Sequence, residues 1–479
     1  MNKPDILIFL SDQHNAMCAG FAGNEIVKTP NLDGMASRGT TFDSAYTSCP
    51  LCVPARMSML TGQLPSKTGI FTNDDAMAED QATFIHSIAA EGYETVLCGR
   101  MHFLGEDQRH GFTKRIMGEI TPLIWGRGGK KRHDLGPFKG TLTEEYCTKV
   151  IGGGTSPVLE YDRAVIKAAE EYLKQDHEKP QLMVVGTYAP HFTYVAPPDL
   201  YQYYKARVGM PVLYGKDITN PSILKKYERS LPEEDIQRIR AAYFGMIENM
   251  DVQIGKIKRA WDEFLHKTGR KGVFVYLSDH GDQIGERNFY GKQTFFDGSS
   301  RIPLIFEGEG IRQGTRMKGA VSIMDIGPTL CELAGAVPPP GQDGRSLMGQ
   351  LISGNDCLER HCISEFVYNS DDEGLIPGRM VRKGKWKLIS YDVNEGSDEL
   401  YDMDSDPWET KNLSGCIKDT EEEFKQLTLE GWDHGKIIEE YTERMEHHKI
   451  LAKWGAVVDV PETERWKVSE EARRLPEIY

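Results

Sequence analysis

The sequence predicts an α/β fold in which a large, mostly parallel sheet is sandwiched by helices. The candidate strands are short and almost continuously apolar, as expected for strands buried on both faces of a parallel sheet. Helical patterns separate these strands through the first three-quarters of the chain, which is typical of doubly wound folds. The 479 residues exceed the about 250–300 at which single cores stop growing, so a second, smaller unit is expected.

The expected elements follow from local patterns. Strands are predicted at 6–10, 95–98, 182–188, 273–277 and 304–306. Helices are predicted at 29–37, 84–90, 161–173, 232–264 and 323–334. Thr29-Pro30 combines an N-cap residue with a proline at the first helical position, and Gly39 and Gly335 stand where helices are expected to end.

After about residue 354 the pattern changes. Short strand-like segments at 361–368, 379–383, 386–391 and 399–403 are separated by Gly, Asn and Asp, and Lys383-Gly384-Lys385 can turn a hairpin. We therefore predict an α/β catalytic domain at 1–354 and a small antiparallel-sheet subdomain at 355–415. The polar, mostly helical segment 416–479 is expected to pack on this body as a C-terminal extension.

Composition excludes several classes of protein. The hydrophobic fraction of 39% and the charged fraction of 27% are those of a folded globular chain. Lys and Arg total 57 against 72 acidic residues, a net charge of −15, so binding to nucleic acid or to an anionic membrane surface is not expected. The N-terminal apolar run at 6–10 is shorter than the about 7–15 residues of a signal peptide core. No run reaches the about 20 residues of a membrane span. We expect a cytoplasmic protein.

The chain has nine cysteines. An odd number spread over so long a chain does not form a disulfide framework. We expect a reducing compartment and mostly buried thiols.

Two predicted strands end in similar ligand sets. Asp12-Gln13 follows the first strand, and Asp279-His280 follows the strand at 273–277. Ligand sites of open α/β sheets lie at the carboxyl ends of the strands, so these four side chains can meet around one cation. Two carboxylates, an amide oxygen and an imidazole suit Ca²⁺, Mg²⁺ or Mn²⁺. The alternative is that both aspartates only cap the turns after their strands.

The segment around Cys52 is a second candidate site. Pro54 suits the first turn of a helix, so Cys52 would lie at the N-terminus of that helix, where anions are favoured. Arg56 adds a bidentate donor for a tetrahedral oxyanion. Cys52 could be a buried inert thiol, a redox or zinc partner of Cys49, or a modified nucleophile. A zinc site is disfavoured because the sequence has no second Cys-x-x-Cys.

The Cys52-x-Pro54-x-Arg56 motif, followed by Leu60-Thr61-Gly62, resembles the signature of type I, formylglycine-dependent sulfatases of the alkaline phosphatase superfamily. Further ordered matches extend over most of the chain. They are Asp12-Gln13, Thr29-Pro30-Asn31-Leu32-Asp33, Ser278-Asp279-His280-Gly281, Gly291-Lys292, Arg301-Ile302-Pro303, Asp325-Ile326-Gly327-Pro328-Thr329 and Glu399-Leu400-Tyr401-Asp402.

The resemblance implies that a formylglycine-generating enzyme oxidises Cys52 to Cα-formylglycine. It also implies one divalent metal, usually Ca²⁺ with Mg²⁺ or Mn²⁺ as alternatives, held by Asp12, Gln13, modified Cys52, Asp279 and His280. Many family members have Asp and Asn at the positions of Gln13 and His280, which bears on the identity of the metal.

The resemblance also implies catalytic roles. Arg56 would hold the formylglycine hydrate, while Lys292 and His191 would bind the sulfate and face the leaving oxygen. His102 would be the base that breaks the covalent intermediate. Arg100 stands where sulfatases commonly have Lys, which keeps the charge but changes the donor geometry.

We therefore expect a sulfuric ester hydrolase that acts on a small anionic ester, a sulfated carbohydrate or metabolite. The alternative is a phosphonate monoester or phosphodiester hydrolase of the same superfamily, against which the Arg100-x-His102 pair argues. A catalytically silent binding protein would result if Cys52 stayed unmodified. His14, Asn73 and Arg301 are weaker candidates for the site, and we expect each to be structural or to lie just outside the groups that contact the substrate. The oligomeric state is left open.

Overall fold

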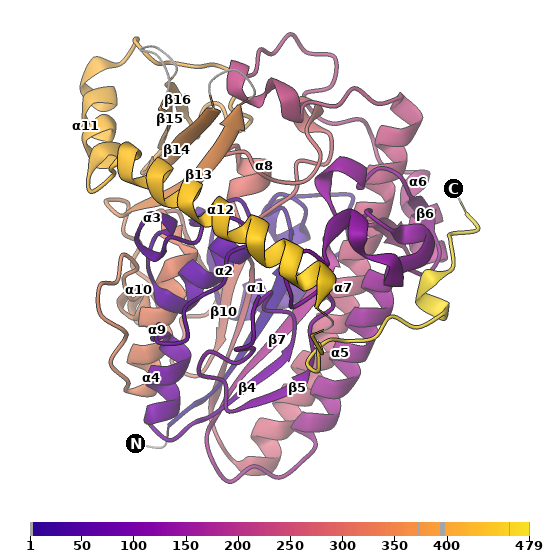
Figure 1. Ribbon diagram of the computed structural model, residues 1–479. Coiled ribbons are helices and arrows are strands. Elements are labelled where there is room, and N and C mark those ends of the chain that lie inside the picture. The colour runs from indigo at the N-terminus through magenta and orange to yellow at the C-terminus, as the bar shows by residue number, and fades with distance from the viewer. Residues whose placement is uncertain (1–2, 371–373, 393–397, 459, 479) are drawn as a thin grey trace.

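The computed structural model describes residues 3–370, 374–392, 398–458 and 460–478. Its centre is an eight-stranded sheet with helices on both faces (Figure 1). The strands lie in the order β11 (Thr315–Met317), β2 (Thr40–Phe42), β10 (Leu304–Gly308), β9 (Gly272–Ser278), β1 (Asp5–Asp12), β7 (Gln181–Pro190), β4 (Glu94–Gly99) and β5 (Lys114–Met117). Only β10 runs antiparallel to its neighbours within this described sheet. The predicted α/β fold is confirmed.

The apolar runs of the strands are continuous because both faces of the sheet are covered. In β1, Leu7 and Phe9 belong to a core with helices α1 (Pro30–Arg38), α5 (Pro157–Leu173) and α7 (Glu233–Thr268). Ile6, Ile8 and Leu10 belong to the opposite core, with helices α2 (Cys52–Thr61), α4 (Phe84–Ala90) and α9 (Ile326–Ala334).

All five predicted strands and all five predicted helices are present, with shifted ends. Helix α5 starts at Pro157, before the predicted residue 161, because the Ser156 hydroxyl caps it by accepting a bond from the Leu159 N–H at 3.3 Å. The segment 323–334 divides into a 3₁₀ turn, Ile323–Asp325, and α9. The short strands β2, β5 and β11 were not predicted.

The predicted small sheet is also present, in the order β13 (His361–Ser370), β14 (Gly374–Lys383), β15 (Trp386–Tyr391) and β16 (Glu399–Asp402), all antiparallel. Lys383 pairs with Trp386, so Gly384 and Lys385 form a two-residue turn, with Gly384 at φ 52°. The buried Lys387 ammonium joins this sheet to the main body, because it lies 2.8 Å from Asp297 and 2.7 Å from Glu409.

The C-terminal region crosses the face of the molecule. Helices α11 (Lys418–Leu429) and α12 (His434–Val457) follow the small sheet, and α12 extends over α2 in the view of Figure 1. Beyond α12, the Glu119 N–H donates to the Glu464 carbonyl and the Trp466 N–H donates to the Glu119 carbonyl, both at 2.8 Å. The chain end is thereby attached to the segment that follows β5.

All nine cysteines lie in the described part of the chain and are free thiols. Seven are buried, Cys357 is partly exposed and Cys416 is exposed, so the prediction of mostly buried thiols is confirmed. Within the described ranges, no helix is both long enough and apolar enough to cross a membrane.

The Lys387 ion pairs give a test of how the small sheet is held. Lys387→Met removes the cation that pairs with the buried carboxylate of Glu409 and leaves Asp297 with Arg301, at 3.3 Å. We expect the free energy of unfolding to fall by about 3–5 kcal/mol. Urea denaturation measures this change. In the control Lys271→Met, which removes an exposed pair with Glu309, the loss should stay below about 1 kcal/mol. Similar losses in both variants would contradict the prediction.

Candidate active site

The expected site residues converge at the carboxyl ends of four neighbouring strands. Asp12 ends β1, Asp279 and His280 follow β9, Arg100 and His102 follow β4, and His191 follows β7. Cys52 is the first residue of α2, as predicted, and Arg56 lies one turn later. Lys292 lies in the loop after β9. Apart from the partly exposed His102, these side chains are buried.

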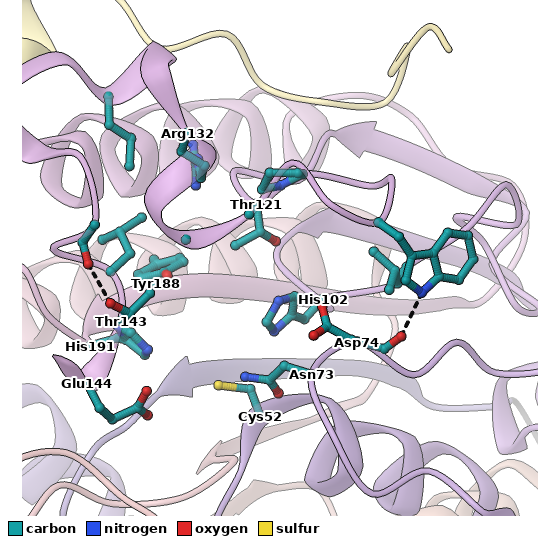
Figure 2. A pocket seen from close by; sticks show the side chains of 18 of the residues that line it. Cys52, Asn73, Asp74, His102, Thr121, Arg132, Thr143, Glu144, Tyr188 and His191 are labelled. Atoms are coloured by element: carbon teal, nitrogen blue, oxygen red, sulfur yellow. Dashed lines mark hydrogen bonds between the residues drawn. The ribbon is translucent and has the colours of Figure 1, made fainter. Parts of the chain in front are cut away.

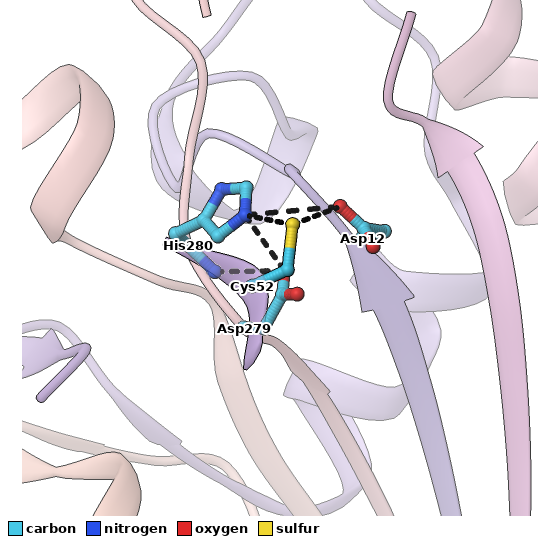
Figure 3. Close-up of side chains that lie close together, drawn as sticks. All are labelled: Asp12, Cys52, Asp279 and His280. Carbon is cyan, nitrogen blue, oxygen red and sulfur yellow. Dashed lines mark hydrogen bonds and ion pairs between the residues drawn. The ribbon is translucent and has the colours of Figure 1, made fainter. Parts of the chain in front are cut away.

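Four side chains form a buried cluster (Figure 3). One ligand atom each of Asp12, Cys52, Asp279 and His280 lies within 4.8 Å of the others. The His280 Nε2 atom is 3.2 Å from the Cys52 sulfur, 3.8 Å from Asp12 and 3.6 Å from Asp279. His280 Nδ1 donates to the Gly281 carbonyl at 3.1 Å, which leaves the Nε2 lone pair directed into the cluster. This donor set fits a divalent cation.

Two arginines fix the carboxylates of the cluster. Arg56 donates to Asp279 at 2.8 Å and to Asp12 at 3.0 Å, and Arg100 donates to the same Asp12 oxygen at 2.5 Å. Burial raises the pKa of Asp12, but the charges of Arg100 and Arg56 hold it well below its usual value. The sequence predicted that Arg56 binds the modified residue 52. The structure shows Arg56 in contact with the carboxylates and with the Arg100 carbonyl, at 3.1 Å, and its bond to a modified residue 52 stays a prediction.

Gln13 connects the cluster to Lys292. Its backbone, at φ 69°, donates to Asp279 at 3.1 Å. Its amide nitrogen donates to Asp282 at 2.7 Å, and its amide oxygen accepts from Lys292 Nζ at 2.9 Å. The amide oxygen that was expected to bind a metal is therefore hydrogen-bonded to a cation.

Lys292 and His191 form a second unit. Lys292 Nζ donates to His191 Nε2 at 2.8 Å and lies 3.5 Å from Glu144. His191 Nδ1 donates to the Phe192 carbonyl at 2.7 Å, so its ring is neutral, and burial together with Lys292 keeps the pKa of His191 well below its usual value. Burial lowers the pKa of Lys292, but neighbouring carboxylates, led by Glu144, raise it above its usual value. The lysine is therefore a cation here.

Arg100 and His102 depend on Glu119, a fully buried acid that the sequence analysis did not identify. Glu119 accepts from Arg100 at 3.2 Å and from the backbone N–H of His102 at 2.7 Å, and His102 has a φ of 63°. Arg100 donates to His102 Nδ1 at 2.8 Å. Because a guanidinium only donates, the neutral ring carries its proton on Nε2. To act as the base that the resemblance implies, His102 would need a lone pair on Nε2.

A cavity of about 240 Å³ opens beside the cluster (Figure 2). Asn73, one of the weaker candidates from the sequence, lines this cavity and accepts from the Val53 N–H at 3.0 Å. His14 and Arg301 do not line it; they contact Tyr276 and Asp297. The expected residues that line the cavity are Cys52, Arg100, His102, His191 and Lys292.

The Cys52 thiol itself is shielded from solvent, with 1% of its side chain exposed. Burial and the neighbouring Asp12 raise its pKa to about 12, so the unmodified residue is a neutral thiol and a weak nucleophile at pH 7.

Comparison with known proteins identifies the family. The sulfatase family model matches residues 4–336, and the model described as N-sulphoglucosamine sulphohydrolase, C-terminal, matches residues 285–430. The chain is 31% identical to a choline-sulfatase of Rhizobium meliloti over 447 residues, which is 86% of this chain and 82% of that protein.

Solved structures share the fold. One is a protein in complex with its substrate D-glucosamine-2-N,6-O-disulfate, with a TM-score of 0.70 and 20% identity, covering 94% of this chain and 99% of that one. Another is a phosphonate monoester hydrolase of Silicibacter pomeroyi, with a TM-score of 0.74 and 18% identity, covering 90% of this chain and 96% of that one. The family model covers more than half of the sequence, and its match includes all the site residues described above. The chain therefore belongs to the sulfatase family and is an enzyme that hydrolyses sulfate esters.

Proposed function

We propose that this sulfatase cleaves a sulfate monoester with residue 52 in the formylglycine form and one divalent cation in the adjacent cluster. The observation that carries the proposal is the position of Cys52. Its sulfur is 3.2 Å from the cluster imidazole of His280, and the same residue lines the cavity together with His102, His191 and Lys292.

Asp12, Asp279, His280 and residue 52 would hold the cation, with Ca²⁺ favoured by the oxygen ligands and Mg²⁺ or Mn²⁺ as alternatives. The ion supplies positive charge that offsets the negative charge on the sulfate oxygens. Arg56 and Arg100 each bind a carboxylate of this set, so they orient both acids toward the ion.

Modification of residue 52 explains how a buried cysteine can serve this reaction. A thiol that attacked sulfur would give a thiosulfate-like dead end, so a formylglycine-generating enzyme is the expected partner during maturation. The hydrated aldehyde supplies two hydroxyls on one carbon, one to attack sulfur and the other to release sulfate as the carbonyl reforms.

The cationic groups of the cavity would bind the ester and move its protons. Lys292 is placed to donate to a sulfate oxygen. Its ammonium, which also donates to His191 Nε2, can give a proton to the oxygen of the leaving alcohol as the S–O bond to that oxygen breaks. His102 presents its Nε2 N–H, fixed by Arg100, as a further donor to the reacting oxygens. A base role for His102 requires this ring to give up its proton first.

The substrate is proposed to be a sulfated sugar or another small sulfated alcohol. Support comes from the choline-sulfatase relative and from the structural neighbour solved with a disulfated glucosamine. Phosphonate monoester hydrolysis is the second candidate because an enzyme of that activity shares the fold. The sulfatase family match and the Arg100-x-His102 pair favour sulfate.

Mass spectrometry of the peptide that contains residue 52 tests the modification. We expect the aldehyde in protein matured in a host with the modifying enzyme, and loss of turnover in Cys52→Ala to the level of the blank. Cys331→Ala, in a core away from the cavity, serves as the control and should keep its turnover. An unmodified thiol in fully active protein would remove the proposed nucleophile.

Asp279→Asn tests the cation site. Removing one carboxylate charge from the cluster should lower bound divalent metal from one equivalent per chain toward none, as measured by elemental analysis after dialysis. Activity should fall in parallel and should return in the wild type, after chelation, on addition of Ca²⁺. Asp262→Asn, on an exposed part of α7, is the control. Equal metal content in the wild type, Asp279→Asn and Asp262→Asn would contradict the assignment of the cluster as the cation site.

A substrate panel separates the two reactions. We expect an aryl sulfate to be hydrolysed with a higher kcat/KM than an aryl phosphodiester or a phosphonate monoester. All three esters carry one negative charge, but only the sulfate has three non-bridging oxygens, and the site is proposed to bind these with the cation, Lys292 and His102. A preference for either phosphorus ester would reverse the proposed function.

A further inference from the structure

We infer that the substrate carries a second anionic group and that Arg132 binds it; the inference rests on the proposed hydrolysis of a sulfate ester in the same cavity. Arg132 lines the cavity that contains Cys52, and its side chain is only 3% exposed. Figure 2 shows Arg132 across the cavity from Cys52 and Asn73. It therefore faces the space that the alcohol part of the ester would fill.

The guanidinium of Arg132 is only partly satisfied within the protein. Nε and Nη2 donate to Asp134 at 3.4 and 3.1 Å. The third nitrogen, Nη1, is buried and has no hydrogen-bond partner among the residues that the structure describes. Buried polar groups almost always have partners, and a buried charged donor without one costs several kcal/mol. An unmet N–H of this kind in a cavity wall indicates a position for a ligand acceptor.

The local charges favour an anion at this position. The Asp134 carboxylate that binds Arg132 is shared with Arg465, at 2.6 Å. Arg465 also pairs with Glu462 at 2.9 Å, and Glu462 pairs with Arg127 at 3.4 Å. This connected group has three guanidiniums and two carboxylates, so it keeps a positive charge. The acids of the cavity lie elsewhere, since Glu144 is beside Lys292 and Asp74 is exposed. A cationic alcohol would instead bring a positive charge toward Arg132.

The size of the cavity limits where the second anion can be. Its volume of about 240 Å³ is below the about 300–1,000 Å³ of sites for drug-sized ligands, so it matches roughly one ring-sized group. A carboxylate or a second sulfate on the sugar that bears the scissile sulfate would reach Arg132. A planar guanidinium suits either oxyanion.

Matched esters test the inference. The probes are methyl hexopyranosiduronates sulfated at O2, O3 or O4 and disulfated methyl hexopyranosides. Their uncharged counterparts are esters with the same scissile sulfate but no second anionic group, the corresponding uronamides and monosulfated methyl hexopyranosides. We expect the best anionic ester to exceed its uncharged counterpart about 10- to 100-fold in kcat/KM, the effect of one hydrogen bond to a charged group. This preference should disappear in Arg132→Met and persist in Arg163→Met, which removes an exposed arginine on α5.

A preference for the uronates or for the disulfated sugars supports the inference and identifies the second anion. Equal rates for charged and uncharged esters in the wild type overturn it, as does a preference that survives in Arg132→Met. Calorimetry with Cys52→Ala separates this inference from the proposed chemistry. If this variant binds the esters with a second anionic group more tightly than those without one, the anion site is retained. If the wild type also hydrolyses none of these esters, the proposed function is refuted while the anion site stands.

Discussion

The carboxylate of Asp12 is the point on which the active site depends. One of its oxygens accepts from both Arg56 and Arg100, and the other lies 3.8 Å from His280. These bonds join β1 to α2 and to the segment after β4, three parts of the site that are far apart in the sequence. Three buried charges at this point are tolerated because each is paired. The same pairing orients the free oxygen toward the cation cluster.

The charge distribution explains how an acidic protein can bind an anion. The net charge is −15, yet Arg100, Arg132 and Lys292 line one cavity. Buried cations interact strongly over short distances because water does not screen them there, whereas the acidic surface is screened within about 8–10 Å by salt. Binding in the cavity is therefore governed by the local set of charges.

The sequence predicted the part of the site that regular structure supplies. Asp12 and Asp279 follow strands whose apolar runs are plain, and parallel neighbours bring such ends together, so the cluster could be anticipated. Glu119 and Arg132 could not, because they lie in irregular segments without periodicity. The partners of Arg56 and Gln13 were also beyond reach, since hydrogen-bond geometry depends on side-chain packing. Helix ends shifted where a cap such as Ser156 was overlooked.

The attachment of the C-terminal segment to the active-site wall has a consequence for the order of assembly. The Arg465 side chain binds Asp134 although the two are 331 residues apart. The backbone carbonyl of Glu464 accepts a hydrogen bond from the backbone N–H of Glu119. A ribosome releases residues 464 and 465 long after the strands of the central sheet. The sheet can therefore form during synthesis, but Glu119 and the cavity-lining Arg132 gain these neighbours only after residues 464 and 465 have been made. A truncated product can have the fold and lack the finished binding site.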